Sequence, residues 1–176
     1  MDPNIGSLKM SPNRVPPVLG VGQYLPFEEG SFHGVHISAA LHHAWKELPS
    51  CLDEIYRVVQ PGGGVIIWEP LDVNPITWLG RQLFKPEDYD TNEKPLDRDK
   101  LLEAVSLNFD ILNIKYYFLF SYTMPHLIAR LPLKSFWRKV AMISFINDKY
   151  LLAHHPFLRF FAAYIKITAI RRNKVE

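Results

Sequence analysis

The sequence predicts an α/β fold in which strands and helices alternate along one chain of 176 residues. Three observations lead to this prediction. Residues 32–40 alternate between apolar and polar side chains, which is typical of a half-buried strand. Residues 65–68 form a short apolar run between turn residues, which is typical of a strand covered by helices on both faces. A helical pattern separates the two, and this order indicates a parallel sheet.

The helix between these strands is predicted from its first residues and its apolar spacing. Ser50 precedes apolar residues at helical spacing, and Asp53, three positions later, completes a capping-box pattern. Pro61 and the three glycines after it are expected to end the helix in a turn. A phosphate-binding loop is not expected there, because no lysine follows and the glycines precede a strand.

The second half of the chain predicts another helix, two strands and a helical insert. The helix is expected to begin near Asp97, and strand patterns follow at 112–120 and 165–169. Residues 123–162 are expected to form a helical insert. Residues 1–17, which include four prolines, are expected to form an irregular lead-in. The whole chain, 1–176, is predicted to be a single domain, which at this size buries roughly 70% of its unfolded surface.

Composition excludes several classes of protein and site. The net charge of +2 is too small to indicate a nucleic-acid partner. Cys51 is the single cysteine, which excludes an internal disulfide and a zinc site with several cysteines, and favours a reducing, cytoplasmic location. His154 and His155 lack partners at ligand spacing, so no metal site is predicted. No apolar stretch reaches the about 20 residues of a membrane span.

Four motifs fall at the ends of predicted strands, where open α/β sheets bind their ligands. They are Asp2-Pro3-Asn4, Gly20-Val21-Gly22-Gln23-Tyr24-Leu25-Pro26-Phe27, Ser38-Ala39-Ala40-Leu41-His42-His43 and Trp68-Glu69-Pro70. Their order and spacing resemble those of a class I S-adenosylmethionine-dependent methyltransferase, of the type 11-like group that modifies small molecules and lipids. The resemblance is most specific from Leu25 to Pro70.

This resemblance implies a Rossmann-like methyltransferase sheet with a helical insert before its last, antiparallel strand. It also implies that the first βαβ unit is lacking, since the family's glycine-rich cofactor loop has no counterpart in this sequence. In the family, the two strands of this unit lie in the sheet between the third and fourth strands. We therefore expect an amino-terminally truncated methyltransferase whose fourth strand has an open edge of unpaired backbone groups.

The resemblance implies S-adenosylmethionine as the cofactor, with its nucleoside bound by the first two motifs. Asp2 corresponds to the acidic residue that accepts hydrogen bonds from the ribose. On the residues alone, a frayed terminal residue is the stronger interpretation of Asp2. Val21 stands where the family has an aspartate that accepts from the adenine amino group. Backbone groups of Val21 and Gly22 are then expected to meet the ring, and Leu25 to flank it.

The later motifs are expected to contact the rest of the cofactor and the acceptor. By resemblance, Ser38 and Ala39 lie near the methionine part of the cofactor, and His43 faces the site. Glu69 closes its strand where a carboxylate can reach a substrate. Two tyrosines of the next strand region can shape an apolar acceptor pocket, although alternating aromatics are more often core; they are Tyr117 and Tyr122. No catalytic residue is predicted, because methyl transfer mainly needs alignment of the acceptor.

We predict methyl transfer to a small-molecule or lipid-like acceptor, with two alternatives. One is a methyltransferase-like protein that binds without catalysing, motivated by Val21 and the lacking loop. The other is a membrane-surface protein that uses the helix at 133–146, where an apolar stripe lies opposite Lys134, Arg138 and Lys139. A lid with that stripe packed over the sheet edge is the simpler interpretation of this helix. A complementing chain or an oligomer would fill the open strand edge.

Overall fold

The computed structural model describes residues 16, 18–83, 94–124, 128 and 132–173. Of the expected lead-in at 1–17, only residue 16 is described, so Asp2 lies outside the described residues. In chain order the elements are β1 (Phe32–Ser38), the 3-10 helix η1 (Leu41–Glu47), α2 (Leu48–Val58), β2 (Val59–Pro70), α3 (Pro75–Leu83), α4 (Arg98–Asn108), β3 (Phe109–Tyr117), the 3-10 helix η2 (Ser121–Thr123), α6 (Lys134–His154), the 3-10 helix η3 (Pro156–Phe161) and β4 (Tyr164–Arg171).

The strands form one mixed sheet in the order β1-β2-β4-β3. β1 and β2 run parallel, and β4 runs antiparallel to both of its neighbours. A parallel pair needs a crossover connection, which η1 and α2 supply. The predicted α/β fold and its antiparallel last strand are confirmed. Within the described part of the chain, β1 is the edge strand, as the resemblance implies for the fourth strand.

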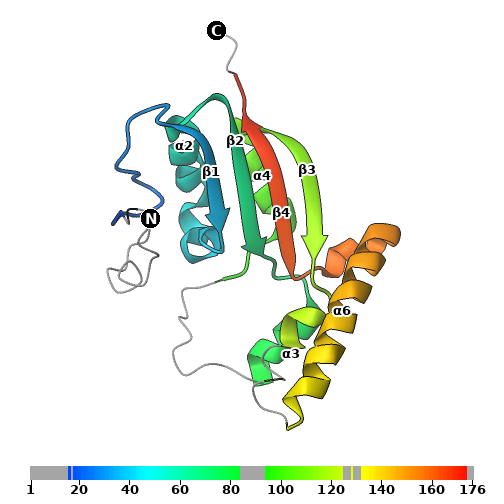
Figure 1. Ribbon diagram of the computed structural model, residues 1–176. Coiled ribbons are helices and arrows are strands. Elements are labelled where there is room, and N and C mark those ends of the chain that lie inside the picture. The colour runs from blue at the N-terminus through cyan, green and yellow to red at the C-terminus, as the bar shows by residue number, and fades with distance from the viewer. Residues whose placement is uncertain (1–15, 17, 84–93, 125–127, 129–131, 174–176) are drawn as a thin grey trace.

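The hydrophobic core lies between the sheet and the two helices α2 and α4, which cover the same face (Figure 1). Alternate strand residues are buried there, as the alternation in β4 shows with Ile165 and Ile167 at 0% exposure. The opposite face carries half-buried Ile66 and Trp68. Among the drawn ribbons, no helix covers that face (Figure 1). The expectation that residues 65–68 are covered by helices on both faces is therefore not met by the described residues.

Local signals located the elements better than they located their ends. α4 begins next to Asp97, as predicted, and the Asp97 side chain caps it by accepting a hydrogen bond from the amide of Lys100. The cap predicted at Ser50 is wrong, since α2 begins at Leu48 with a proline in its first turn and Ser50 lies inside it. The glycine run lies inside β2, where Gly62 adopts a positive φ of 72°.

Two buried polar side chains hold the helical insert below the sheet. The carboxylate of Asp148 on α6 is 1% exposed and accepts hydrogen bonds from the amides of Leu119, Phe120 and Ser121. The amide nitrogen of Asn74 donates to the carbonyl of Leu119. Its side-chain oxygen accepts from the amides of the first turn of α3. The loop after β3 is thereby fixed to both α3 and α6.

α6 packs with only part of the apolar stripe that its sequence suggested. Trp137 and Val140 are half-buried, whereas Leu133, Phe136 and Ile143 are 74%, 54% and 59% exposed. The interpretation of this helix as a lid with its stripe packed away is wrong for these three residues. Helical spacing identified an apolar stripe, but the side that packs is set by Asp148 and its partners.

The first prediction concerns two glycines of β2. A Cβ at Gly63 would lie 2.7 Å from Cγ1 of Val59 and 2.8 Å from two carbonyl oxygens, so Gly63→Ala must displace backbone. We expect it to lower the free energy of unfolding by about 1–3 kcal/mol. Gly64→Ala, where a Cβ meets nothing within 4 Å, is expected to change it by less than about 1 kcal/mol. Urea denaturation followed by circular dichroism compares them, and equal midpoints would contradict this packing.

Candidate functional site

The carboxyl ends of β1 and β2 lie side by side, since Ser38 pairs with Trp68 in their parallel register. β1 leads directly into η1, and β2 continues into Glu69 and Pro70. Ligands of open α/β sheets bind outside such ends. The motifs at 38–43 and 68–70 are therefore brought together at one edge of the sheet, as the sequence predicted.

Glu69 joins the two strand ends through its carboxylate. The side chain is 0% exposed, and its Oε1 accepts hydrogen bonds from the amides of Ala40 at 2.8 Å and Leu41 at 2.9 Å. Its Oε2 lies 2.9 Å from Nδ1 of His42. The first amides of a helix lack partners within the helix, and here a carboxylate from the neighbouring strand supplies them. A buried carboxylate is tolerated because these donors surround it.

This geometry gives Glu69 a part in holding the loop that follows β1. Its oxygens face the backbone of residues 40–42, beneath the loop. A contact between Glu69 and a substrate stays a prediction. The partner that the sequence did not reveal is His42, whose ring belongs to this cluster. The predicted His43 is exposed, and its ring lies beside that of His42, tilted by 40° with 4.1 Å between ring centroids.

Ala39 turns the chain out of β1 with an unusual backbone conformation. Its φ is +48°, in the left-handed region that residues with a Cβ rarely adopt, while its amide donates to the carbonyl of Trp68 at 2.8 Å. Backbone strain of this kind gathers at functional sites. Ser38, directly before it, is exposed. Two predicted cofactor residues thus form a strained turn on a rigid support.

The loop predicted to meet adenine is fixed to α2. The amide of Leu25 donates to Glu54 at 2.8 Å, and the guanidinium of Arg57 donates to the carbonyls of Leu25 and Phe27. Glu54 and Arg57 also pair with each other at 2.8 Å. The Arg57 hydrogen bond lowers the pKa of Glu54 below its usual value, against the opposing effect of burial. The pair therefore clamps the carboxyl-terminal end of the loop, at Leu25 and Phe27.

Gly22 of this loop lies against the side chain of Cys51. A Cβ at Gly22 would be 3.0 Å from the Cys51 sulfur, so a glycine is needed for this approach. Cys51 is 1% exposed, and burial, helped by the charge of Glu47, raises the pKa of its thiol to about 11. The thiol is a packing surface for the loop.

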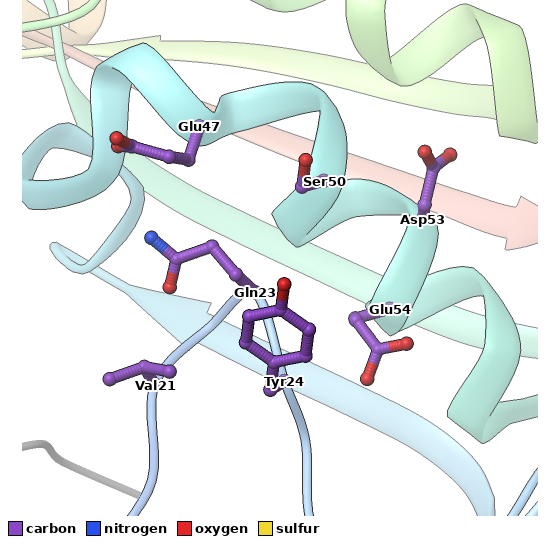
Figure 2. A pocket seen from close by; sticks show the side chains of 7 residues that line it. All are labelled: Val21, Gln23, Tyr24, Glu47, Ser50, Asp53 and Glu54. Carbon is purple, nitrogen blue, oxygen red and sulfur yellow. The ribbon is translucent and has the colours of Figure 1, made fainter.

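A cavity of about 630 Å³ opens between this loop and α2 (Figure 2). Figure 2 shows Gln23 and Tyr24 from the loop facing Glu47 and Ser50 from the helix side. The full lining is Val21, Gln23, Tyr24, Glu47, Ser50, Asp53 and Glu54. This lining includes Val21 but neither Ser38 nor Ala39. Among the described residues, the predicted adenine-binding loop and the predicted methionine-binding turn are therefore held by different elements.

The predicted acceptor tyrosines belong to an aromatic cluster at the same end of the sheet. Tyr117 lies 4.6 Å from Trp68 between ring centroids, and Tyr122 lies 5.4 Å from Tyr164. Burial, and then the neighbouring Tyr122, raises the pKa of Tyr164 above its usual value, which keeps this phenol neutral. Trp68 and Tyr164 were not predicted as site residues, because their proximity depends on the register of β2, β4 and β3.

The Glu69 contacts generate a prediction about stability. In Glu69→Gln, the side-chain oxygen can still accept from the amides of residues 40 and 41, but the negative charge is lost and an NH2 group replaces the oxygen that faces the amide and ring nitrogen of His42. We expect the free energy of unfolding to fall by about 2–4 kcal/mol. Glu29→Gln is the control, since its 70% exposed side chain pairs with Arg171 at the surface, and a change below about 1 kcal/mol is expected. Similar urea midpoints for both variants would refute the role of Glu69.

The clamp on the loop generates a pH prediction. Because the folded pKa of Glu54 is lowered, its contribution to stability is present above the usual carboxyl pKa of about 4.3 and is lost as pH falls through the folded value. Wild type should thus be more stable than Glu54→Gln at neutral pH, and this difference should shrink near pH 3. Urea denaturation at both values measures it. A difference independent of pH would rule out the charged clamp.

Comparison with known proteins adds sequence relatives to this geometry. Residues 2–67 match the family model described as a methyltransferase domain. An uncharacterized methyltransferase of Synechocystis is 36% identical over 77 residues, which cover 43% of this chain and 35% of that protein. The chain thus spans about a third of the curated relative that it matches.

Solved structures share the fold at low identity. An S-adenosylmethionine-dependent methyltransferase of Archaeoglobus fulgidus has a TM-score of 0.62 and is 17% identical in sequence. The match covers 96% of this chain and 73% of the Archaeoglobus chain. A geranyl diphosphate C-methyltransferase of Streptomyces coelicolor, solved with geranyl diphosphate and S-adenosyl-L-homocysteine, has a TM-score of 0.53 and 15% identity, covering 88% and 53%. Residues 2–67 thus match a methyltransferase domain, and the described fold is the one that S-adenosylmethionine-dependent methyltransferases share.

Proposed function

We propose that this chain takes part in S-adenosylmethionine-dependent methyl transfer to a small-molecule or lipid-like acceptor. One observation carries the proposal, namely the strained turn at Ala39 where two parallel strands end. Glu69 holds the backbone directly after that turn. A left-handed alanine in a tightly held loop fits a surface shaped for a ligand rather than a simple connection.

The turn suits the methionine end of the cofactor in its donor and acceptor groups. The amides of residues 40 and 41 already donate to Glu69, so they are not donors for a ligand. The groups that remain at the turn are acceptors, namely the exposed hydroxyl of Ser38 and backbone carbonyls. An ammonium group such as that of the cofactor's methionine part needs acceptors. The bound cofactor would supply a methyl group already activated on a sulfonium.

The nucleoside end is supported less completely by the side chains. We propose that the backbone of Val21 and Gly22 meets the adenine and that Leu25 flanks it, on the loop that Glu54 and Arg57 clamp. Val21 offers no side-chain acceptor for the adenine amino group. The proposed ribose contact of Asp2 falls outside the described residues.

The acceptor is proposed to bind at the aromatic cluster formed by Trp68, Tyr117 and Tyr122 with Tyr164. Half-buried aromatic rings offer apolar surface with a few polar handles, which suits a molecule with a hydrocarbon part. The Streptomyces relative in fold was solved with geranyl diphosphate, an acceptor of this chemical character. His43, exposed beside the turn, is proposed to line the cofactor site.

A second candidate function is binding without catalysis. Val21 favours it, because the lost acceptor weakens recognition of adenine at one defined place. The two candidates differ in whether a bound cofactor loses its methyl group to an acceptor.

Calorimetric titration with S-adenosylmethionine tests the proposal. We expect a dissociation constant in the micromolar range, near −8 kcal/mol in binding free energy. Ala39→Leu places a larger side chain at the left-handed turn and should weaken binding about tenfold or more. Ala153→Leu makes the same change at an exposed position of α6 and should leave binding unchanged. Circular dichroism establishes that each variant is folded.

Transfer of a radiolabelled methyl group to extracted lipids and small molecules then separates the two candidates. Cofactor binding with labelled product supports methyl transfer. Binding without any labelled product favours the non-catalytic candidate. Absence of cofactor binding by folded protein contradicts methyl transfer by this chain.

A further inference from the structure

The outer face of α6 is apolar and open to solvent. Its residues are Phe136, Lys139, Met142, Ile143, Ile146 and Tyr150, which we call the outer face. At 3.6 residues per turn they fall within an arc of about 120° centred opposite Asp148. Four of the apolar members, Met142, Ile143, Ile146 and Tyr150, are 58–62% exposed. The helix therefore buries its Asp148 side and presents hydrocarbon to the surroundings.

The charges on this helix all have one sign where they reach solvent. Lys134, Arg138, Lys139 and Lys149 are exposed. The one acidic residue of α6 is Asp148, which is 1% exposed and bound to the loop after β3. An apolar face beside basic side chains, without an exposed acid on the same helix, complements a surface that combines hydrocarbon with negative charge.

α6 has the support and length of a helix that lies on a membrane. Among the described residues, no helix is long and apolar enough to cross one. The inner side of α6 is fixed to the loop after β3 through Asp148, and Figure 1 shows the helix beside the sheet's lower end, extending beyond it. The outer face is thus held rigidly and turned away from the domain, so no refolding is needed for it to meet a flat surface.

We propose that the outer face of α6 docks on the surface of an anionic lipid bilayer, with its apolar side chains at the boundary between headgroups and acyl chains. Lys139 on the outer face and Lys149 beside it contact the lipid phosphates. The proposal goes beyond methyl transfer and does not depend on it, since it uses no cofactor residue. A second copy of the chain on the same face is the rival occupant.

Vesicle flotation with the full chain tests the proposal. One set of vesicles contains equal parts of phosphatidylglycerol and phosphatidylcholine, and the other contains phosphatidylcholine alone. We expect the partition coefficient to be at least about tenfold higher for the anionic vesicles and to fall with added salt. Absence of association with the anionic vesicles would overturn the proposal, and so would equal association with both sets.

Matched variants locate the contact. Ile143→Ser/Ile146→Ser should weaken association about tenfold, while Leu107→Ser/Leu112→Ser, which changes two leucines 69% and 62% exposed on other elements, should not. Lys139→Gln/Lys149→Gln should weaken it by more than about tenfold, at about fivefold per lysine. Lys100→Gln/Lys115→Gln removes two exposed lysines elsewhere and is the charge control.

Oligomeric state decides against the rival occupant. All variants change exposed side chains, so melting curves should match those of wild type. Sedimentation of the wild-type chain without lipid is expected to give the same state as Ile143→Ser/Ile146→Ser. A dimer that this double variant dissociates would overturn the proposal in favour of a second copy. Equal effects of the test and control variants on flotation would overturn it as well.

Discussion

The contact between the Glu69 carboxylate and the amides of residues 40–42 is the constraint on which the site depends. It spans 27 to 29 positions in sequence and ties the end of β2 to the loop after β1. Without it, η1 would begin with unpaired amides, and the left-handed turn at Ala39 would be held only by its hydrogen bond to the carbonyl of Trp68. The parallel register aligns the strand ends, and the hydrogen bonds of Glu69 fix the backbone of residues 40–42 beside them.

Asp148 solves the same physical problem at the next loop. A carboxylate from one element accepts the amides of a 3-10 helix that begins after a strand, so η1 and η2 are both capped from a distance. In each case a charged group is buried only because several donors surround it. The loops that border the proposed site are thus rigid for the same reason, although their sequences share no local capping motif.

The sequence predicted what local patterns determine. The strand alternation in β1, the apolar run in β2 and the start of α4 near Asp97 are local features, and each appears in the structure. The pairing of Glu69 with His42 was not predictable, because it depends on the register of two strands. The exposure of Ile143 was not predictable either, since helical spacing defines a stripe without saying which side is packed.

The site follows the same division between local and distant determinants. The family resemblance identified the turn at residues 38 and 39, and the structure brings it to the carboxyl edge of the sheet. The clamp made by Glu54 and Arg57 escaped notice, because both residues lie on a helix that otherwise looks like core packing. Residues that hold a loop from a neighbouring element leave no motif of their own in the sequence.

The contact between Gly22 and Cys51 gives the molecule a built-in reporter. The lone thiol lies sealed beneath the loop, and its high pKa keeps it protonated and unreactive at neutral pH. Any motion that lifts the loop from α2 would uncover this sulfur and lower its pKa toward that of a free cysteine. The rate at which a thiol reagent modifies Cys51 in the native protein would then measure how often this part of the site opens.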